Sequence, residues 1–181
     1  ALFSAWKPII DAIGVVPNGD LGVKCVINGN YAAVSKQAHT GQNPNAVYIF
    51  KKVSGSWSVI QKIQGQSRAY DGFGKSLAMK GDILAIGAPT HYSTNPHSAS
   101  YEKGGVYIYK LNAGGTAYEA HMGEANFDYS HLYSTDVSLN NQAHVLYPTS
   151  QNNFGTNLDL WYNGSNEYRL IVSQSQHGQI N

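Results

Sequence analysis

The residues that could carry catalysis or hold a metal are few in this chain, and their spacing suits neither task. The seven histidines form no metal-binding pair on one strand or helix, and no HExxH motif occurs. There is no GxSxG elbow for a nucleophilic serine. The 11 carboxylates are scattered, and nothing in their spacing brings two together as a glycosidase requires. We therefore expect no catalytic residues, no metal and no cofactor.

Aromatic and amide side chains in the polar segments suit a different task, the recognition of a ligand with little charge. Tyrosine rings give flat amphipathic faces and amides give neutral hydrogen-bonding groups, which fit a sugar or a protein partner. The segment 90–104 concentrates these residue types, although it could equally be a plain exposed polar loop. The predicted ligand-contacting residues are Asn43, His91, Tyr92, Asn95, His97, Tyr101, Asn153 and Phe154.

Composition excludes several classes of protein. Among 181 residues, 12 Lys and Arg balance 11 Asp and Glu, and a net charge of +1 argues against nucleic acid as a partner. The 13 Tyr, 5 Phe and 3 Trp are too many for a disordered chain. No run of about 20 apolar residues is present, so no membrane-spanning helix is expected.

The single cysteine, Cys25, excludes an internal disulfide framework. Because Cys25 falls at an alternating position of a predicted strand, we expect it to be a small buried hydrophobe. The chain begins at Ala1 without the features of a signal peptide, which indicates a processed product, a trimmed chain or a fragment.

The elements that must position these residues are predicted to be short β-strands. Helical periodicity is nearly absent, and short alternating runs are broken by Gly, Asn, Ser and Pro. Turn signals such as Asn28-Gly29-Asn30 separate the runs, since Gly and Asn tolerate the positive φ of tight hairpins. The chain is therefore predicted to be all-β. Predicted strands include 31–34, 46–50, 83–86, 105–109 and 168–172.

These strands recur as an internal repeat of four strands per unit. The three copies are 21–34 with 47–50, 73–86 with 106–109, and a weaker one, 133–146 with 158–161. A fourth strand closes each copy, at 57–63, 118–122 and 168–172. A period of this size predicts the blades of a β-propeller.

The second copy carries a known motif. Residues 71–89, DGFGKSLAMKGDILAIGAP, followed by GGVYIY at 104–109, resemble an FG-GAP repeat, the blade unit of integrin-α-like propellers. The resemblance implies a binding or adhesion role outside the cell or on the surface of a cell or particle. Many such blades carry an acidic calcium loop between their first two strands. Here the three corresponding turns hold one carboxylate, Asp82, so no calcium site is expected.

The predicted organisation is a single partial propeller over residues 1–181, with blades at about 18–65, 66–125 and 126–175. Segment 1–14 is expected to supply the outer strand of a neighbouring blade, because Trp6–Ile10 resembles Trp57–Ile60. Closed propellers have about four to eight blades. We therefore expect more chain, identical subunits or another protein to complete the ring or cover its edges.

The sequence thus predicts a non-catalytic surface module that binds a glycan or a protein. Segments 36–45, 90–104 and 149–157 should gather on one face of the propeller and form its ligand site. The alternative is a structural subunit of a larger assembly, such as a virion, a filament or a cell-surface complex. Residues 163–165 fit a glycosylation sequon, which a hairpin turn explains as well.

Overall fold

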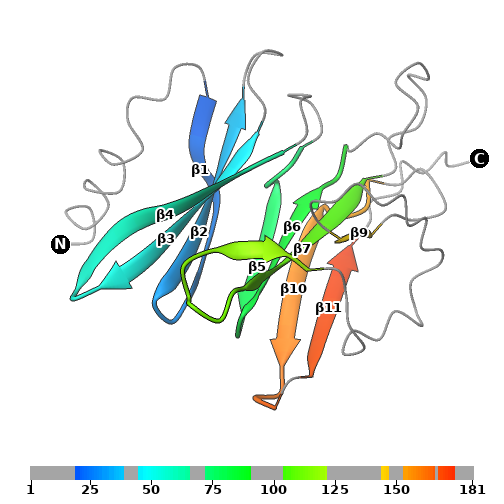
Figure 1. Ribbon diagram of the computed structural model, residues 1–181. Helices are drawn as coiled ribbons and strands as arrows, with labels where there is room; N and C mark the ends of the chain where they lie inside the picture. The colour runs from blue at the N-terminus through cyan, green and yellow to red at the C-terminus, as the bar shows by residue number, and fades with distance from the viewer. Residues whose placement is uncertain are drawn as a thin grey trace, which may run out of the picture.

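The computed structural model describes residues 19–38, 45–65, 72–90, 104–121, 144–146, 153–165 and 167–173. All regular elements in these ranges are β-strands, arranged in three groups that lie side by side (Figure 1). The all-β prediction is confirmed. Within the described ranges, no helix has the length and apolar character needed to cross a membrane.

The first sheet contains four consecutive antiparallel strands. They are β1 (Gly19–Asn28), β2 (Tyr31–Ala38), β3 (Ala46–Val53) and β4 (Ser56–Gln64), in that spatial order. The turn between β1 and β2 contains Gly29 at φ 59°, a conformation that glycine adopts at little cost. This simple up-and-down order is what the predicted four-stranded blade requires.

The second sheet repeats this order and the third group is smaller. The second sheet contains β5 (Ser76–Lys80), β6 (Ile83–Ala88), β7 (Gly105–Leu111) and β8 (Tyr118–Ala120), with β9 (His144–Leu146) also paired to β7. The third group is the hairpin of β10 (Asn157–Tyr162) and β11 (Tyr168–Ser173). All residues of β6 are buried, which explains why it is a continuous apolar run.

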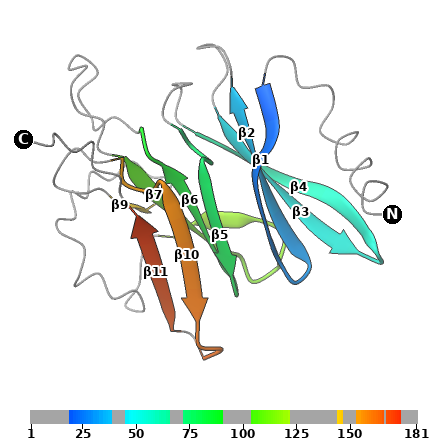
Figure 2. The same ribbon diagram turned by 180° about the vertical axis from the view of Figure 1, so that it is seen from behind.

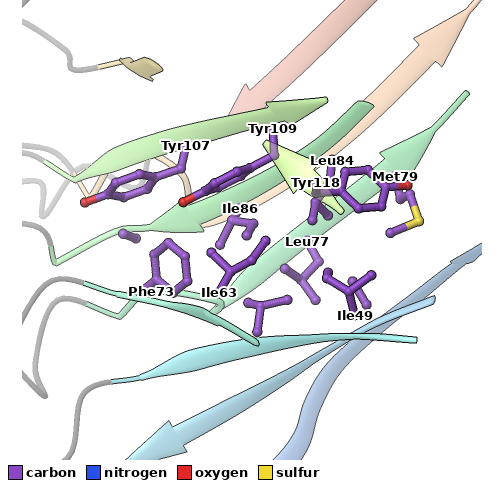
Figure 3. Packing of buried hydrophobic residues seen from close by; sticks show 13 residues of the cluster. Ile49, Ile63, Phe73, Leu77, Met79, Leu84, Ile86, Tyr107, Tyr109 and Tyr118 are labelled. Carbon is purple, nitrogen blue, oxygen red and sulfur yellow. The ribbon is translucent and has the colours of Figure 1, made fainter. Parts of the chain in front are cut away.

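The three groups pack face to face through two apolar layers. In one layer, Ile49 and Ile63 of the first sheet pack in one cluster with Leu77 and Ile86 of the second (Figure 3). The opposite face of the second sheet, which includes Ile108, packs on β10 and β11. Figures 1 and 2 show this hairpin on the side of the second sheet away from β1–β4. The second sheet is therefore the central layer of the described structure.

The fourth strand of the second sheet is split into two short pieces. In the first sheet, β4 pairs with the whole length of β3, from Ala46 to Val53. In the second sheet, β8 pairs only with Tyr109–Leu111, and β9 pairs with Val106–Ile108 on the same edge of β7. The two pieces together satisfy the backbone groups that one strand satisfies in the first sheet.

This pairing corrects the predicted third copy of the repeat. The sequence alignment placed 143–146 beside 158–161 in one sheet, but β9 lies in the second sheet and β10 pairs with β11. The alignment was wrong here because it treated β9, which completes the edge of the second sheet, as the second strand of a new unit. The blade limits at 18–65, 66–125 and 126–175 stay predictions, and segment 1–14 lies outside the described residues.

Cys25 is exposed, contrary to the expectation that it is buried. It lies on β1, an edge strand of the first sheet, although it is paired with the buried Val34. The register of β1 shifts between Leu21 and Cys25, so the alternation of inward and outward positions is interrupted there. Alternation in sequence therefore misassigned this residue.

A glutamine joins the outer strands of the two large sheets. The side chain of Gln61 on β4 donates to the carbonyl oxygen of Tyr118 at 2.8 Å and accepts from the Tyr118 N–H at 2.7 Å. We expect Gln61→Leu to lower the free energy of unfolding by about 1–3 kcal/mol, because two backbone groups lose their partners. Gln64→Leu on the same strand, at an exposed position, is the control and should change it little. Urea unfolding measures both, and equal effects would contradict the role given to Gln61.

Buried tyrosines make the stability sensitive to alkaline pH. Burial raises the pKa of Tyr109, Tyr118 and Tyr168 above the ordinary value of 10.0. Their neutral forms favour the folded state, so the free energy of unfolding is retained below pH 10 and falls as the pH rises above it. Urea unfolding at pH 8 and pH 11 should show this loss.

Comparing the hydroxyls of Tyr118 and Tyr31 separates the effect of burial on stability from the effect of a hydrogen bond. This hydroxyl has no partner among the described residues, whereas the Tyr31 hydroxyl donates to the Gly115 carbonyl oxygen at 2.9 Å. Tyr118→Phe should therefore cost less than about 0.5 kcal/mol at pH 8, and Tyr31→Phe about 0.5–1.5 kcal/mol. Tyr118→Phe should also make the alkaline loss of stability shallower, and an unchanged pH dependence would count against the burial argument.

Candidate functional site

The described strands have two unlike ends. Short hairpins close one end, which we call the turn end, at Gly29, Gly55, Gly81 and Gly164. The other end, the loop end, is where β2, β4 and β6 finish and where β3, β5, β7 and β10 begin. The β2–β3 connection at 39–44 and the β6–β7 connection at 91–103 therefore start and finish at the loop end.

A tight turn before β5 forms the centre of the loop end. Gly72 and Gly74 have φ of 68° and 82°, and the Lys75 N–H donates to the Gly72 carbonyl oxygen at 2.9 Å. Phe73 between them is fully buried, and its ring meets Tyr107 edge to face with centroids 5.1 Å apart. The aromatic side chain thus anchors the turn in the core.

The same turn fits against the first sheet. A Cβ atom on Gly74 would lie 3.0 Å from Ser35 Cβ and 3.1 Å from Val47 Cγ2. The Gln37 side chain donates to the Phe73 carbonyl oxygen at 2.8 Å. The end of β2 and the start of β5 are therefore held together, which brings the first and second sheets into contact at the loop end.

A second close contact joins the second sheet to the β10–β11 hairpin. The Ser76 hydroxyl donates to the Gly155 carbonyl oxygen at 2.6 Å. A Cβ atom on Gly87 would collide with that same carbonyl oxygen, and Gly104 forms a parallel bridge with Phe154. Backbones approach so closely here that a side chain has no room.

One charged residue at the loop end was not singled out from sequence. Lys36 is only 9% exposed and lies opposite Ala46. Burial, and secondarily the charge of Lys62, lower the pKa of the Lys36 ammonium group. The available signal was alternation, because Lys36 follows Ala32 and Val34 on one face of β2.

Only two of the predicted ligand-contacting residues are described. Asn153 has a positive φ of 47°, and its carbonyl oxygen accepts a hydrogen bond of 2.6 Å from the Thr156 hydroxyl. Phe154 is 7% exposed and belongs to the core between the second sheet and the hairpin, so its ring supports the loop end from within. Asn43, His91, Tyr92, Asn95, His97 and Tyr101 lie outside the described residues, and their role stays a prediction.

The Asp82 carboxylate, in the turn between β5 and β6, is engaged by neighbouring strands. The Tyr168 hydroxyl donates to the Asp82 carboxylate, and Lys110 Nζ lies 3.6 Å from Asp82 Oδ2. Burial, and then the hydrogen bond to Asp82, raise the pKa of Tyr168. Within the described ranges, no three His, Cys, Asp or Glu side chains gather as a metal site would need. Asp82 thus serves as a link between β6, β7 and β11.

Part of the chain that forms this packing matches a known protein family. Residues 57–109, from β4 to β7, match the family model of the FG-GAP repeat. This segment is an FG-GAP repeat. The match confirms the resemblance seen in the sequence and covers both the Phe73-Gly74 turn and Gly87-Ala88-Pro89. No curated protein matches the chain.

The glycines of the FG-GAP repeat act here as contact points between sheets. The absence of a side chain at Gly74 lets the first sheet approach closely, and its absence at Gly87 does the same for the β10–β11 hairpin. The Gly74 N–H donates to the Gly87 carbonyl oxygen at 2.9 Å. One motif therefore fixes both neighbours of the sheet that carries it, and it does so at the loop end.

Gly87 offers a direct test of this packing. Its φ is not positive, so an alanine there is free of backbone strain, and the nearest atoms that its Cβ would meet are the Ser76 hydroxyl and the Gly155 backbone. Gly87→Ala should lower the free energy of unfolding by about 2–3 kcal/mol through overpacking. Gly114→Ala, in the turn between β7 and β8 with no atom closer than 3.7 Å, is the matched control and should change it by less than about 1 kcal/mol. Guanidinium unfolding compares the two, and similar values would show that the sheets are not held by this contact.

Proposed function

We propose that this chain is a non-catalytic propeller-type module that binds a glycan or a protein ligand at its loop end. The supporting observation is the separation of the two ends of the strands. Short hairpins occupy the turn end, whereas the connections 39–44 and 91–103 are attached at the loop end. Binding residues often lie on connections held by a rigid scaffold.

The rigidity of the anchor points supports this choice of end. Connection 91–103 begins after the buried Pro89 and finishes at the buried Gly104, next to Phe154. Connection 39–44 leads into Asn45, which is 1% exposed and whose carbonyl oxygen accepts from the Gly65 N–H at 2.9 Å. The predicted residues Asn43, His91, Tyr92, Asn95, His97 and Tyr101 fall in these two connections.

The location and chemistry in this proposal follow from the FG-GAP repeat. Such repeats are typical of extracellular or surface proteins and are generally not catalytic. The module accordingly works outside the cell or on a surface, and it needs no cofactor. A low charge and many Tyr and Asn side chains suit a neutral ligand.

A second candidate function has its own observation. Trp161 and Ile171, which project from β10 and β11, are 47% and 63% exposed. Large apolar side chains exposed on one sheet face favour a structural subunit whose neighbour covers them. In that case the protein would be recovered with its partners and would bind no isolated glycan.

A glycan array distinguishes the two candidates. The labelled 181-residue protein should bind at least one class of neutral glycan, and binding should persist in EDTA because no calcium site is expected. Tyr92→Ala and Tyr101→Ala should weaken binding at least about tenfold, since each removes an aromatic stacking surface. Trp161→Ala, an exposed aromatic near the turn end, is the control. Binding that survives both tyrosine changes, or an array without signal, would refute the glycan-binding proposal.

A further inference from the structure

The backbone around Phe154 repeats the turn that opens the FG-GAP repeat. Gly72 and Gly74 have φ of 68° and 82°, and Asn153 and Gly155 have φ of 47° and 90°. Phe154, like Phe73, lies between the two positive-φ residues and is buried. Two consecutive turns with this unusual pattern, each holding a Phe-Gly pair, indicate the start of another repeat unit at Asn153.

The contacts of the two turns also correspond. The Gly74 N–H donates to the Gly87 carbonyl oxygen at 2.9 Å, and the Gly155 N–H donates to the Ser173 carbonyl oxygen at 3.1 Å. A Cβ atom on Gly74 would lie 3.1 Å from Val47 Cγ2 of β3. One on Gly155 would lie 3.2 Å from Val106 Cγ2 of β7, the same position one sheet further on.

The strands that follow match in register and in the face they bury. Ser76 and Leu77 pair with Gly87 and Ile86, as Asn157 and Leu158 pair with Ser173 and Val172. Side chains of β10 and β11 pack on the second sheet as those of β5 and β6 pack on the first. The corresponding pairs are Leu158 with Leu77, Leu160 with Met79, Leu170 with Leu84, and Val172 with Ile86. The hairpin therefore supplies the first two strands of a third unit.

The third strand of this unit is absent from the described part of the chain. β2 carries β3 on its far edge and β6 carries β7, whereas β11 pairs with β10 alone within the described ranges. The consequence is visible in burial. Leu84 and Ile86 are fully buried, but their counterparts Leu170 and Val172 are only partly buried. A strand beside β11 would cover them as β7 covers β6.

Hydrogen-bond directions at this edge agree with a strand position that no described strand occupies. The Asn163 N–H donates to the Glu167 carbonyl oxygen at 3.2 Å, so along β11 the odd-numbered residues bond to β10 and the even-numbered ones point outward. Leu170 and Val172 thus direct backbone groups away from β10. On β6, the bond from the Leu111 N–H to the Asp82 carbonyl oxygen fixes the same arrangement toward β7.

We propose that the outer edge of β11 at Leu170 and Val172, which no described strand covers, binds a β-hairpin of a partner protein whose first strand alternates small apolar and aromatic residues. The repeat gives this chemistry, because β3 contains Val47-Tyr48-Ile49-Phe50 and β7 contains Val106-Tyr107-Ile108-Tyr109. Tyr107 lies opposite Ile86 and against Phe73. The partner's tyrosine therefore lies opposite Val172 and against Phe154. Backbone hydrogen bonds between β11 and the partner strand would supply affinity. The alternating side chains of the partner strand would supply specificity.

A labelled peptide tests this site without depending on the ligand of the loop end. The probe is residues 45–65, the β3–β4 hairpin, added to the 181-residue protein and followed by fluorescence anisotropy. The control peptide has the same composition with Val47 exchanged for Tyr48 and Ile49 for Phe50, which reverses the two faces. We expect saturable binding of the probe and at least about tenfold weaker binding of the control. Equal binding of both peptides, or none, would overturn the proposal.

Two protein variants separate the edge from the side chain. Val172→Pro removes an outward N–H and should weaken binding of the probe at least about tenfold. Val172→Ala keeps that N–H and should stay within about threefold of the parent protein. Circular dichroism of both variants checks that they retain the fold. Equal loss in the two variants would contradict strand pairing at this edge.

Amide hydrogen exchange locates the bound peptide independently of any variant. Protection should appear at 168–173 and not on β1 or β4, the edge strands of the complete first sheet. Protection on those edges instead would overturn the proposal. Slow exchange at 168–173 in a dimer of the free protein would assign the edge to a second copy of the chain, and would overturn it as well.

Discussion

The described structure depends on backbone contact between neighbouring sheets at one end of the strands. Gly74, Gly87, Gly104 and Gly155 lie where a Cβ atom would crowd or strike the adjacent sheet. Side chains elsewhere keep packed sheets about 10 Å apart, so contacts this close draw the sheets together at the loop end. The motif that identifies the repeat is thus the feature that sets the position of each sheet against the next.

The turn end is held by side chains instead. The Asn28 side chain donates to the Gly81 carbonyl oxygen at 2.7 Å, and the hydroxyl of Tyr168 reaches the next turn at Asp82. Lys51 and Tyr31 both donate to the Gly115 carbonyl oxygen. Side chains span a wider gap than glycine contacts do. Neighbouring sheets are therefore closer together at the loop end than at the turn end. The longer connections are attached at the end where the sheets are held most closely.

The sequence was sufficient for the fold class, strands β1–β8 and the FG-GAP motif, because alternation and turn residues are local signals. It failed where partners are not local. β9 pairs with β7 across a long stretch of chain, and Cys25 follows a register shift. The proposed third unit had a readable signal, since Phe154-Gly155 matches Phe73-Gly74. It was missed because Asn153 occupies the position where the motif elsewhere has Gly72, a substitution that is possible because asparagine tolerates positive φ.

The two complete sheets fix the direction that a strand beside the outer edge of β11 would take. β3 and β7, which occupy the third position in the complete sheets, both begin at the loop end, at Ala46 and Gly105. A strand that pairs with β11 in the same sense must also begin there, beside Ser173. The connection that precedes it would then join the platform formed around Gly104 and Phe154. Completing the third unit would therefore enlarge the loop end as well as cover an edge, so assembly and ligand binding would share one surface.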